Sequence, residues 1–417
     1  MSAETLPQTC LFERYRGLTP AQQRLLLVHM KRQDAEWSIP PSAALARSGA
    51  PDATALGFSL LFFSDRARPG VPLYELLMQC AERADAAGLE AIWVPERHFH
   101  DFGGPFPNPA LLACAIAGRT SRIGIRAGSV VLPLHNPIRV VEDWSVVDNL
   151  SGGRCGVAVA SGWHPVDFRL LSEVSYEQRR PYTLTQIDRV NAMWQRRTPI
   201  RSSSGGDQPA SGMRLHPLPV QPILPLWLTS TSRRQTWLEA ARRGMGVLTG
   251  LLEQTKDDLF ENIGAYRKEL ACYHAPGAAK VTLMLHCLLG PDPQAARAKA
   301  RLAMTEYFRN HMQMYLPFVR TSNPGLDVDA LSQADRDALV VKGVERYLAG
   351  NALVGSAEAV DPLCRQLHER GVDEIACLVD FGPSSEDVLE TIAQLEILVP
   401  RATSAAAARR LGKETPK

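Results

Sequence analysis

Short apolar runs recur along most of the chain, with more polar, helix-like segments between them. Eight of these runs are almost continuously apolar instead of alternating with polar residues, a pattern typical of parallel strands covered on both faces. The intervening segments carry helix signals: one helix is predicted over 73–87, ending at Gly88, and another begins at Pro137 and ends at "SGGR" (151–154). The strand-like runs cover 57–63, 91–96, 123–133, 155–162, 224–231, 245–252, 280–290 and 374–382.

Eight strand–helix units in one chain predict an α/β fold of the TIM (β/α)8 barrel type. A doubly wound sheet is the rival, but no Gly-rich phosphate loop follows the first run. Two insertions interrupt the repeat, one after the fourth strand (196–222) and one after the seventh (306–356). Long insertions after barrel strands commonly form lids or substrate walls.

Both ends of the chain differ from this repeat. Residues 1–52 predict a helix capped by Thr19 and Pro20, followed by an extended linker, and together they form a candidate docking segment. We assign 53–400 to the barrel and expect the small, polar stretch 401–417 to be a flexible tail.

Composition narrows the class of protein. Hydrophobic residues make up 45% and charged residues 22%, as in ordinary globular proteins. A net charge of +2 gives no reason to expect nucleic acid or an anionic membrane as a partner. No run approaches the roughly 20 apolar residues of a membrane span, and no signal peptide is recognisable. The eight cysteines are scattered singly without a CxxC pair, which favours free thiols and a cytoplasmic location.

Candidate chemistry lies at the ends of the strand-like runs, because TIM-barrel sites form at the carboxyl ends of strands. The second run ends in "WVPERHFHDFGG", where His98 is the main candidate and Glu96 and Arg97 are interpreted as an ion pair. His98 and His100 also resemble the first ligands of metal hydrolases. Later strand ends offer only Asp380 as a further ligand, so we predict no metal.

Other strand ends contribute small residues and further histidines. His135 and His164 each follow a strand end, and either a site role or a plain hydrogen-bonded loop role fits them. The remaining histidines have no supporting context and are interpreted as structural. The third and fourth runs end at Gly128, Ser129, Ser161, Gly162 and Trp163, and the structural histidines are His29, His216, His274, His286, His311 and His368.

The fifth run ends in "TSTSRRQT", which also begins a helix. Hydroxyls and free N–H groups at a helix N-terminus bind phosphate well, so Ser230 and Thr231 are candidate phosphate ligands. Arg179 and Arg180 are candidates for the countercharge. A simple helix-capping run is the alternative interpretation.

Several long phrases resemble the luciferase-like, flavin-dependent monooxygenases, in particular the branch associated with polyketide and nonribosomal peptide biosynthesis. They are "ERHFHDFGGPFPNP", "RIGIRAGSVVLPLHNPIRVVEDWSVVDNLSGGR", "VAVASGWHPVDF", "YEQRRPY" and "GVLTGLL". The resemblance covers most of 55–400. It implies a TIM barrel that binds FMNH2 supplied by a separate flavin reductase. Molecular oxygen adds at the flavin C4a, and the resulting peroxide gives one oxygen atom to a biosynthetic intermediate, free or tethered to a carrier protein. Hydroxylation, N-oxygenation and Baeyer–Villiger insertion all remain open.

The resemblance also implies roles for individual residues. His98 takes the place of the active-site histidine that stabilises the peroxyflavin, with Phe99 excluding water. Gly128-Ser129 falls where relatives carry a non-proline cis peptide beneath the flavin ring. The remaining cofactor contacts implied are Ser161, Gly162 and Trp163 along the ring or ribityl chain, and Arg179, Ser230 and Thr231 at the phosphate.

The sequence departs from the family pattern at one turn, and two alternative functions stay open. Ser232-Arg233-Arg234 stands where close relatives have Gly-Asn-Pro type residues, so the added arginines either strengthen phosphate binding or hold a larger phosphate-bearing group. A homodimer through the helices after the second and third strands is expected. An F420-dependent oxidoreductase on the same barrel is one alternative function. A catalytically silent flavin-binding protein that docks through 1–52 is the other.

Overall fold

The computed structural model describes residues 55–63, 71–99, 106–195, 215–251, 254–275, 277, 279–310 and 331–399. The predicted N-terminal helix and linker, the tail, His100, and parts of both insertions (196–214 and 311–330) lie outside these residues. In the described part, no helix is long and apolar enough to cross a membrane.

Eight parallel strands close into a barrel, as predicted. Neighbouring strands pair in the order β1 to β6, then β7 and β9, and β9 pairs back with β1. Each of the eight apolar runs contains one of these strands. The strands are β1 (Gly57–Leu61), β2 (Ala91–Val94), β3 (Gly124–Val131), β4 (Cys155–Ala160), β5 (Leu226–Thr229), β6 (Gly246–Gly250), β7 (Val281–Leu289) and β9 (Glu374–Leu378).

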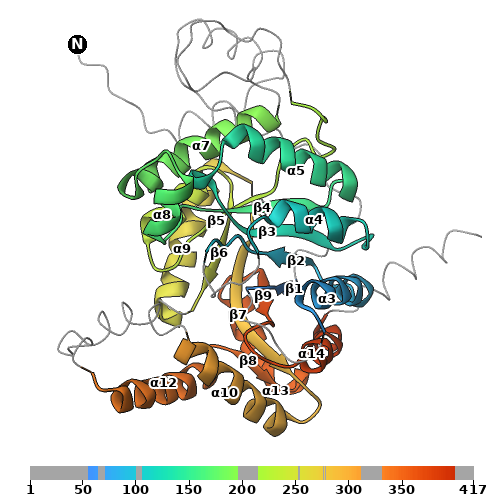
Figure 1. Cartoon of the computed structure of the whole chain (residues 1–417), viewed down its shortest axis with the longest axis vertical. Helices are drawn as coiled ribbons and strands as arrows, with labels where there is room; N and C mark the ends of the chain where they lie inside the picture. Colours follow the sequence, from blue (N-terminus) through green and yellow to red (C-terminus); the bar gives the residue numbers. More distant parts are fainter. Residues whose placement is uncertain are drawn as a thin grey trace, which may run out of the picture.

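Helices surround the barrel (Figure 1). The predicted limits of two helices are confirmed: Gly88 follows α3 and Gly152 follows α5, each with positive φ, a conformation that glycine adopts without strain. The helices on the barrel are α3 (Leu73–Ala87), α4 (Pro109–Ala117), α5 (Pro137–Ser151), α6 (Pro165–Leu171), α7 (Arg179–Trp194), α8 (Arg234–Arg242), α9 (Lys256–Tyr273), α13 (Ala357–Glu369) and α14 (Ser385–Leu398).

The second insertion adds a ninth strand that the sequence did not predict. It contains the end of α10 (Pro293–Asn310), α12 (Gln333–Leu348) and the three-residue β8 (Leu353–Gly355). β7 pairs with β9 as far as His286 and then with β8 from Cys287 onward. Figure 1 shows this group at one end of the molecule, where α10 packs on α12 and β8.

The amino end of the barrel interior is filled by a buried ionic cluster. Arg126 stacks between the rings of Trp93 and Trp227, at 4.9 and 4.6 Å from their centroids. Its guanidinium donates to both carboxylate oxygens of Glu374 at 2.8 and 2.7 Å and to Glu90 at 3.1 Å. These contacts satisfy charges that would otherwise be costly to bury. The barrel is therefore closed by side chains at this end.

The seven described cysteines are all free thiols, as expected. They are Cys80, Cys114, Cys155, Cys272, Cys287, Cys364 and Cys377.

Candidate active site

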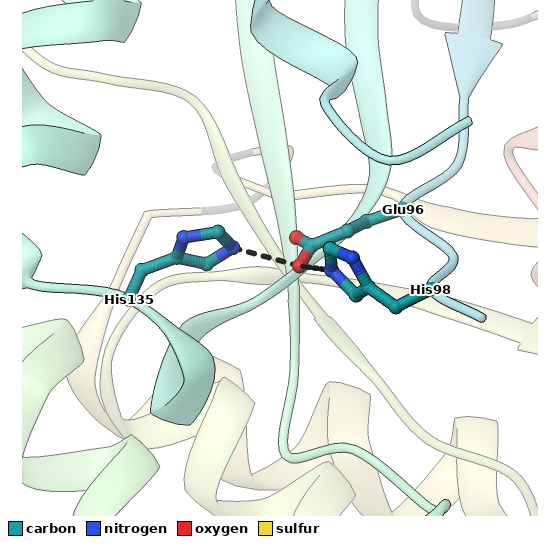
Figure 2. A group of neighbouring side chains, drawn as sticks. All are labelled: Glu96, His98 and His135. Atoms are coloured by element: carbon teal, nitrogen blue, oxygen red, sulfur yellow. Dashed lines mark hydrogen bonds and ion pairs between the residues drawn. The ribbon is translucent and has the colours of Figure 1, made fainter. Parts of the chain in front are cut away.

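Two histidines meet one buried carboxylate just beyond the end of β2. Oε1 of Glu96 lies 2.7 Å from Nε2 of His98 and 2.7 Å from Nε2 of His135 (Figure 2). The other oxygen, Oε2, accepts the backbone N–H of Val131 at 2.9 Å. His135 follows a short 3-10 turn after β3, so two neighbouring strand ends supply the cluster.

The ionisation state of Glu96 determines which atoms donate hydrogen bonds in this cluster. Burial opposes ionisation of Glu96, but hydrogen bonds from His135 and His98 outweigh it and hold the pKa of Glu96 below its usual value. An ionised carboxylate only accepts, so both Nε2 atoms donate. Burial also disfavours charge on His135, yet the hydrogen bond and charge of Glu96, with Asp143, raise the pKa of His135.

The metal-site alternative can be compared with this geometry. Ligand atoms of Glu96, His98 and His135 lie within 4.8 Å of one another, which is close enough to surround an ion. In the structure these atoms are joined directly by hydrogen bonds. This set differs from the His98–His100 pair considered from the sequence, and His100 lies outside the described residues.

The expected pairing of Glu96 with Arg97 is wrong. Glu96 uses its oxygens for the two histidines and Val131, whereas the Arg97 guanidinium stacks over Phe63 at 4.6 Å and Trp163 at 4.7 Å. Arg97 thus joins residues that follow β1, β2 and β4. Burial lowers the pKa of Arg97 to about 10, while Tyr307 and Asp167 act to raise it.

Arg97 is a site residue that the sequence interpretation missed. Trp93 belongs to the cluster of side chains inside the barrel, and Arg97 lies just beyond the end of the same strand, β2. Its place at the carboxyl end of a barrel strand was the available signal. Beyond it, Phe99 has φ 58° and is 64% exposed, which does not fit the expected water-excluding role.

The non-proline cis peptide expected at Gly128-Ser129 is present on β3. A Cβ at Gly128 would lie 3.2 Å from the Cβ of Trp93, so a larger residue would need the barrel interior to shift. The Ser129 hydroxyl lies 2.7 Å from the hydroxyl of Thr229 at the end of β5. The two neighbouring hydroxyls place polar groups from β3 and β5 together at the carboxyl end.

The residues expected after β4 are held by the start of α7. Gly162 has φ 79°, and its carbonyl accepts Nε of Arg179 at 3.1 Å. The Arg179 guanidinium also lies over the Tyr176 ring at 3.6 Å. Ser161 is half-buried, and Trp163 is 47% exposed although one face of its ring meets Arg97. The structure therefore brings the β4 end and Arg179 together.

The turn before α8 combines an unsatisfied hydroxyl with positive charge. Ser230 is 7% exposed, and its Oγ has no hydrogen-bond partner among the described residues. Thr231 accepts Nε1 of Trp237 through its carbonyl at 2.9 Å. α8 has no side-chain cap at its N-terminus. Buried hydroxyls are rarely left without a partner, so Ser230 fits a site for an acceptor such as a phosphate oxygen.

Positive charge lies in the neighbourhood of this turn. Burial lowers the pKa of Arg180, and the charges of Arg179, its neighbour in the sequence, and of Arg233 on the turn lower it further. Arg234, the other added arginine of the turn, instead pairs with Glu261 on α9 at 2.9 Å. The group therefore has positive charge available for an anion, and the residues present fit the phosphate of FMN.

Comparisons with known proteins agree with this fold. The family described as luciferase-like monooxygenase matches residues 56–374. The chain belongs to this family. Its relatives include a flavin-dependent monooxygenase, so flavin-dependent monooxygenation is the activity that family membership supports.

Two curated relatives illustrate the range of similarity. The oxygenase component of the flavin-dependent trigonelline monooxygenase of Acinetobacter baylyi is 22% identical over 323 residues, covering 75% of this chain and 85% of the relative. The 4-hydroxyprotoasukamycin monooxygenase of Streptomyces nodosus subsp. asukaensis is 36% identical over 112 residues, covering 27% of this chain and 30% of the relative.

Two solved structures share the fold. The oxygenating constituent of 3,6-diketocamphane monooxygenase from Pseudomonas putida, in complex with FMN, superposes with a TM-score of 0.63 at 17% identity, covering 83% of this chain and 97% of that one. An F420-dependent secondary alcohol dehydrogenase gives a TM-score of 0.60 at 14% identity, covering 84% and 100%. At these identities both likenesses concern the barrel alone.

Proposed function

We propose that the protein is an FMNH2-dependent monooxygenase that transfers one oxygen atom to an intermediate of natural-product biosynthesis, free or bound to a carrier protein. The observation that carries the cofactor assignment is the buried Ser230 hydroxyl without a partner beside the arginines at the start of α8. A phosphate there gives that hydroxyl an acceptor and the arginines a counterion. The FMN-bound relative and the flavin-dependent relative favour FMN over F420.

Reduced flavin, when bound, supplies the two electrons that activate molecular oxygen. The chain's own residues hold it and manage protons. Ser230, Thr231, Arg179 and Arg233 would bind the phosphate, and Gly128-Ser129 and Ser161–Trp163 would support the ring and ribityl chain. His98 exchanges a proton through Nδ1, because its Nε2 is bonded to Glu96.

Partners follow from the same proposal. A separate reductase supplies the reduced flavin, as the name "oxygenase component" implies for the trigonelline enzyme. Similarity to the protoasukamycin enzyme supports a natural-product substrate. A homodimer through α4 and α5 is supported by the exposed apolar residues Leu111, Val146 and Leu150 on those helices.

Anaerobic equilibrium dialysis tests the cofactor assignment. We expect FMNH2 to bind, F420 to bind more weakly, and Ser230→Ala to raise the dissociation constant for FMNH2 by about tenfold or more, since a hydrogen bond to a charged group is lost. Thr305→Ala is the matched control, because Thr305 only bonds Arg301 of its own helix. Preferential binding of F420, or no difference between the two variants, would contradict the assignment.

Oxygen use tests the catalytic assignment. With FMNH2 bound, His98→Ala should retain the cofactor but release hydrogen peroxide in place of oxygenated product, with turnover reduced by about 10²–10⁴-fold. Oxygen consumption, peroxide release and transfer of ¹⁸O to substrate analogues are measured in parallel. Unchanged turnover would remove His98 from the mechanism, and absence of oxygen transfer by wild type would favour a silent flavin-binding protein.

A further inference from the structure

The cluster at Glu96 contains a second histidine, His135, for which the sequence left a site role and a plain loop role both open. We propose that His135 is a positioning residue for His98: the two imidazoles share the Glu96 carboxylate, His135 carries the positive charge, and His98 is thereby kept neutral with Nδ1 as its proton acceptor. The proposal rests on the proposed function, in which His98 handles protons. It adds a residue and a charge distribution to that site.

The geometry allows only one positive charge in this cluster. Both Nε2 atoms lie 2.7 Å from the same oxygen, and the second oxygen of Glu96 is bonded to the Val131 N–H. The Glu96 side chain has no exposed surface. One carboxylate balances one imidazolium, and a second imidazolium on the same oxygen would leave an excess positive charge away from water. Protonation of the two histidines is therefore anticooperative.

Exposure assigns the charge to His135. Its side chain is 34% exposed, against 12% for His98, so water solvates a charge on His135 better. Asp143 on α5 also favours the charged form of His135, although Asp143 is itself paired with Arg139. Among the described residues, the charged groups that act on His135 are thus Glu96 after β2 and Asp143 on α5.

The consequence for His98 is a fixed tautomer. Because Glu96 accepts from Nε2, a neutral His98 carries its proton there and presents a lone pair at Nδ1. In turnover, Nδ1 of His98 accepts a proton that the bound substrate releases and becomes cationic. His135 then loses its Nδ1 proton to solvent, since Glu96 balances only one cation. One proton enters at His98 and one leaves at His135, so the charge of the cluster is restored without moving Glu96.

Histidine NMR tests the coupling in the protein without cofactor. With ¹³Cε1-labelled histidine, we expect His135 in wild type to titrate above the ordinary value of about 6.5. In His135→Gln the apparent pKa of His98 should rise by about one unit or more, because the competing cation is gone. His274→Gln is the control, since His274 bonds only the Arg242 carbonyl. An identical His98 titration in wild type and His135→Gln would overturn the proposal.

A pH–rate profile separates this role from a structural one. If His98 must be neutral, the acid limb of kcat in His135→Gln should move to higher pH by the same shift, with near wild-type kcat above about pH 8. A uniform loss of kcat at every pH would overturn the proposal, and His135→Asn repeats the test if the Gln variant folds poorly. Absence of oxygen transfer by wild type would instead reject the proposed function, leaving the NMR result valid.

Zinc provides a further check. Addition of Zn²⁺ to the protein without cofactor should leave the His98 and His135 titrations unchanged if the cluster is a hydrogen-bonded pair. Stoichiometric zinc binding that abolishes both titrations would overturn the proposal in favour of a metal site.

Discussion

Two histidine sites in this barrel have opposite surroundings. His135 shares a carboxylate with His98, and its pKa is raised although both imidazoles are largely covered by protein. His286 on β7 is fully buried among aromatic rings, with Tyr307, Tyr347 and Phe381 at centroid distances of 5.1–5.3 Å. Burial there lowers the pKa of His286 to about 3.

The opposite pKa shifts come from the hydrogen-bond partners of the two histidines, because both sites exclude water. The His286 Nδ1 lies 3.0 Å from the neutral Tyr347 hydroxyl, and its Nε2 has no hydrogen-bond partner among the described residues. No carboxylate offsets the cost of charging this imidazole, so it stays neutral. At the other site, the buried carboxylate of Glu96 reverses the direction of the pKa shift, so that the pKa of His135 is raised. A histidine's burial alone therefore does not reveal its charge.

Removing the Glu96 carboxylate should have the largest effect on this difference between the two histidine sites. Glu96→Ala leaves two imidazoles and the Val131 N–H without their acceptor, and we expect the free energy of unfolding to fall by about 3 kcal/mol or more. Urea denaturation at pH 7 measures the change. Glu82→Ala, which removes an exposed ion pair with Arg119, should cost less than about 1 kcal/mol. Equal losses in the two variants would show that the Glu96 cluster adds no special stability.

The pH dependence of the free energy of unfolding should next reveal the buried, neutral His286. The folded-state pKa of His286, about 3, is below the unfolded value of about 6.5. Its contribution is thus present above pH 6.5 and is lost as pH falls toward 3. Between pH 6.5 and 4.5, wild type should lose about 1–3 kcal/mol relative to His286→Leu. Parallel curves for the two proteins, measured by urea denaturation at several pH values, would mean that His286 is charged when folded.

The His135–Glu96 pair should show the smallest effect of pH on stability, with the opposite sign. The pKa of His135 is raised, so its ion pair with Glu96 stabilises the fold fully below about pH 6.5 and less as pH rises through the folded pKa. The advantage of wild type over His135→Gln should therefore shrink between pH 6 and 9. We expect a change below about 1 kcal/mol, because the imidazole is partly exposed and screened. A growing advantage at high pH would reverse the assignment.

The barrel was predictable because each of its strands is a continuous apolar run. β8 was not, since three residues carry too little pattern and its pairing depends on the extra length of β7. Helix limits such as Gly88 and Gly152 were predictable because a left-handed position favours glycine.

The site was predictable only in part. His98 and the Gly128-Ser129 cis bond came from the resemblance, and the latter is confirmed. The link between Glu96 and His135 joins positions 39 residues apart and depends on how two strand ends pack. Arg97 was assigned to the wrong partner because Glu96 is its neighbour in the sequence, whereas its contacts with Phe63 and Trp163 join the ends of other strands. The partnerless Ser230 hydroxyl is likewise a property of packing that no sequence pattern carries.

The ionic cluster around Arg126 has a consequence for the kinetics of binding. With Trp93, Trp227 and Glu374 filling the amino end, ligands reach the interior only from the carboxyl ends of the strands. Where two ligands occupy the interior together, we expect the one that sits deeper to arrive first and depart last, and premature arrival of the outer ligand to act as inhibition.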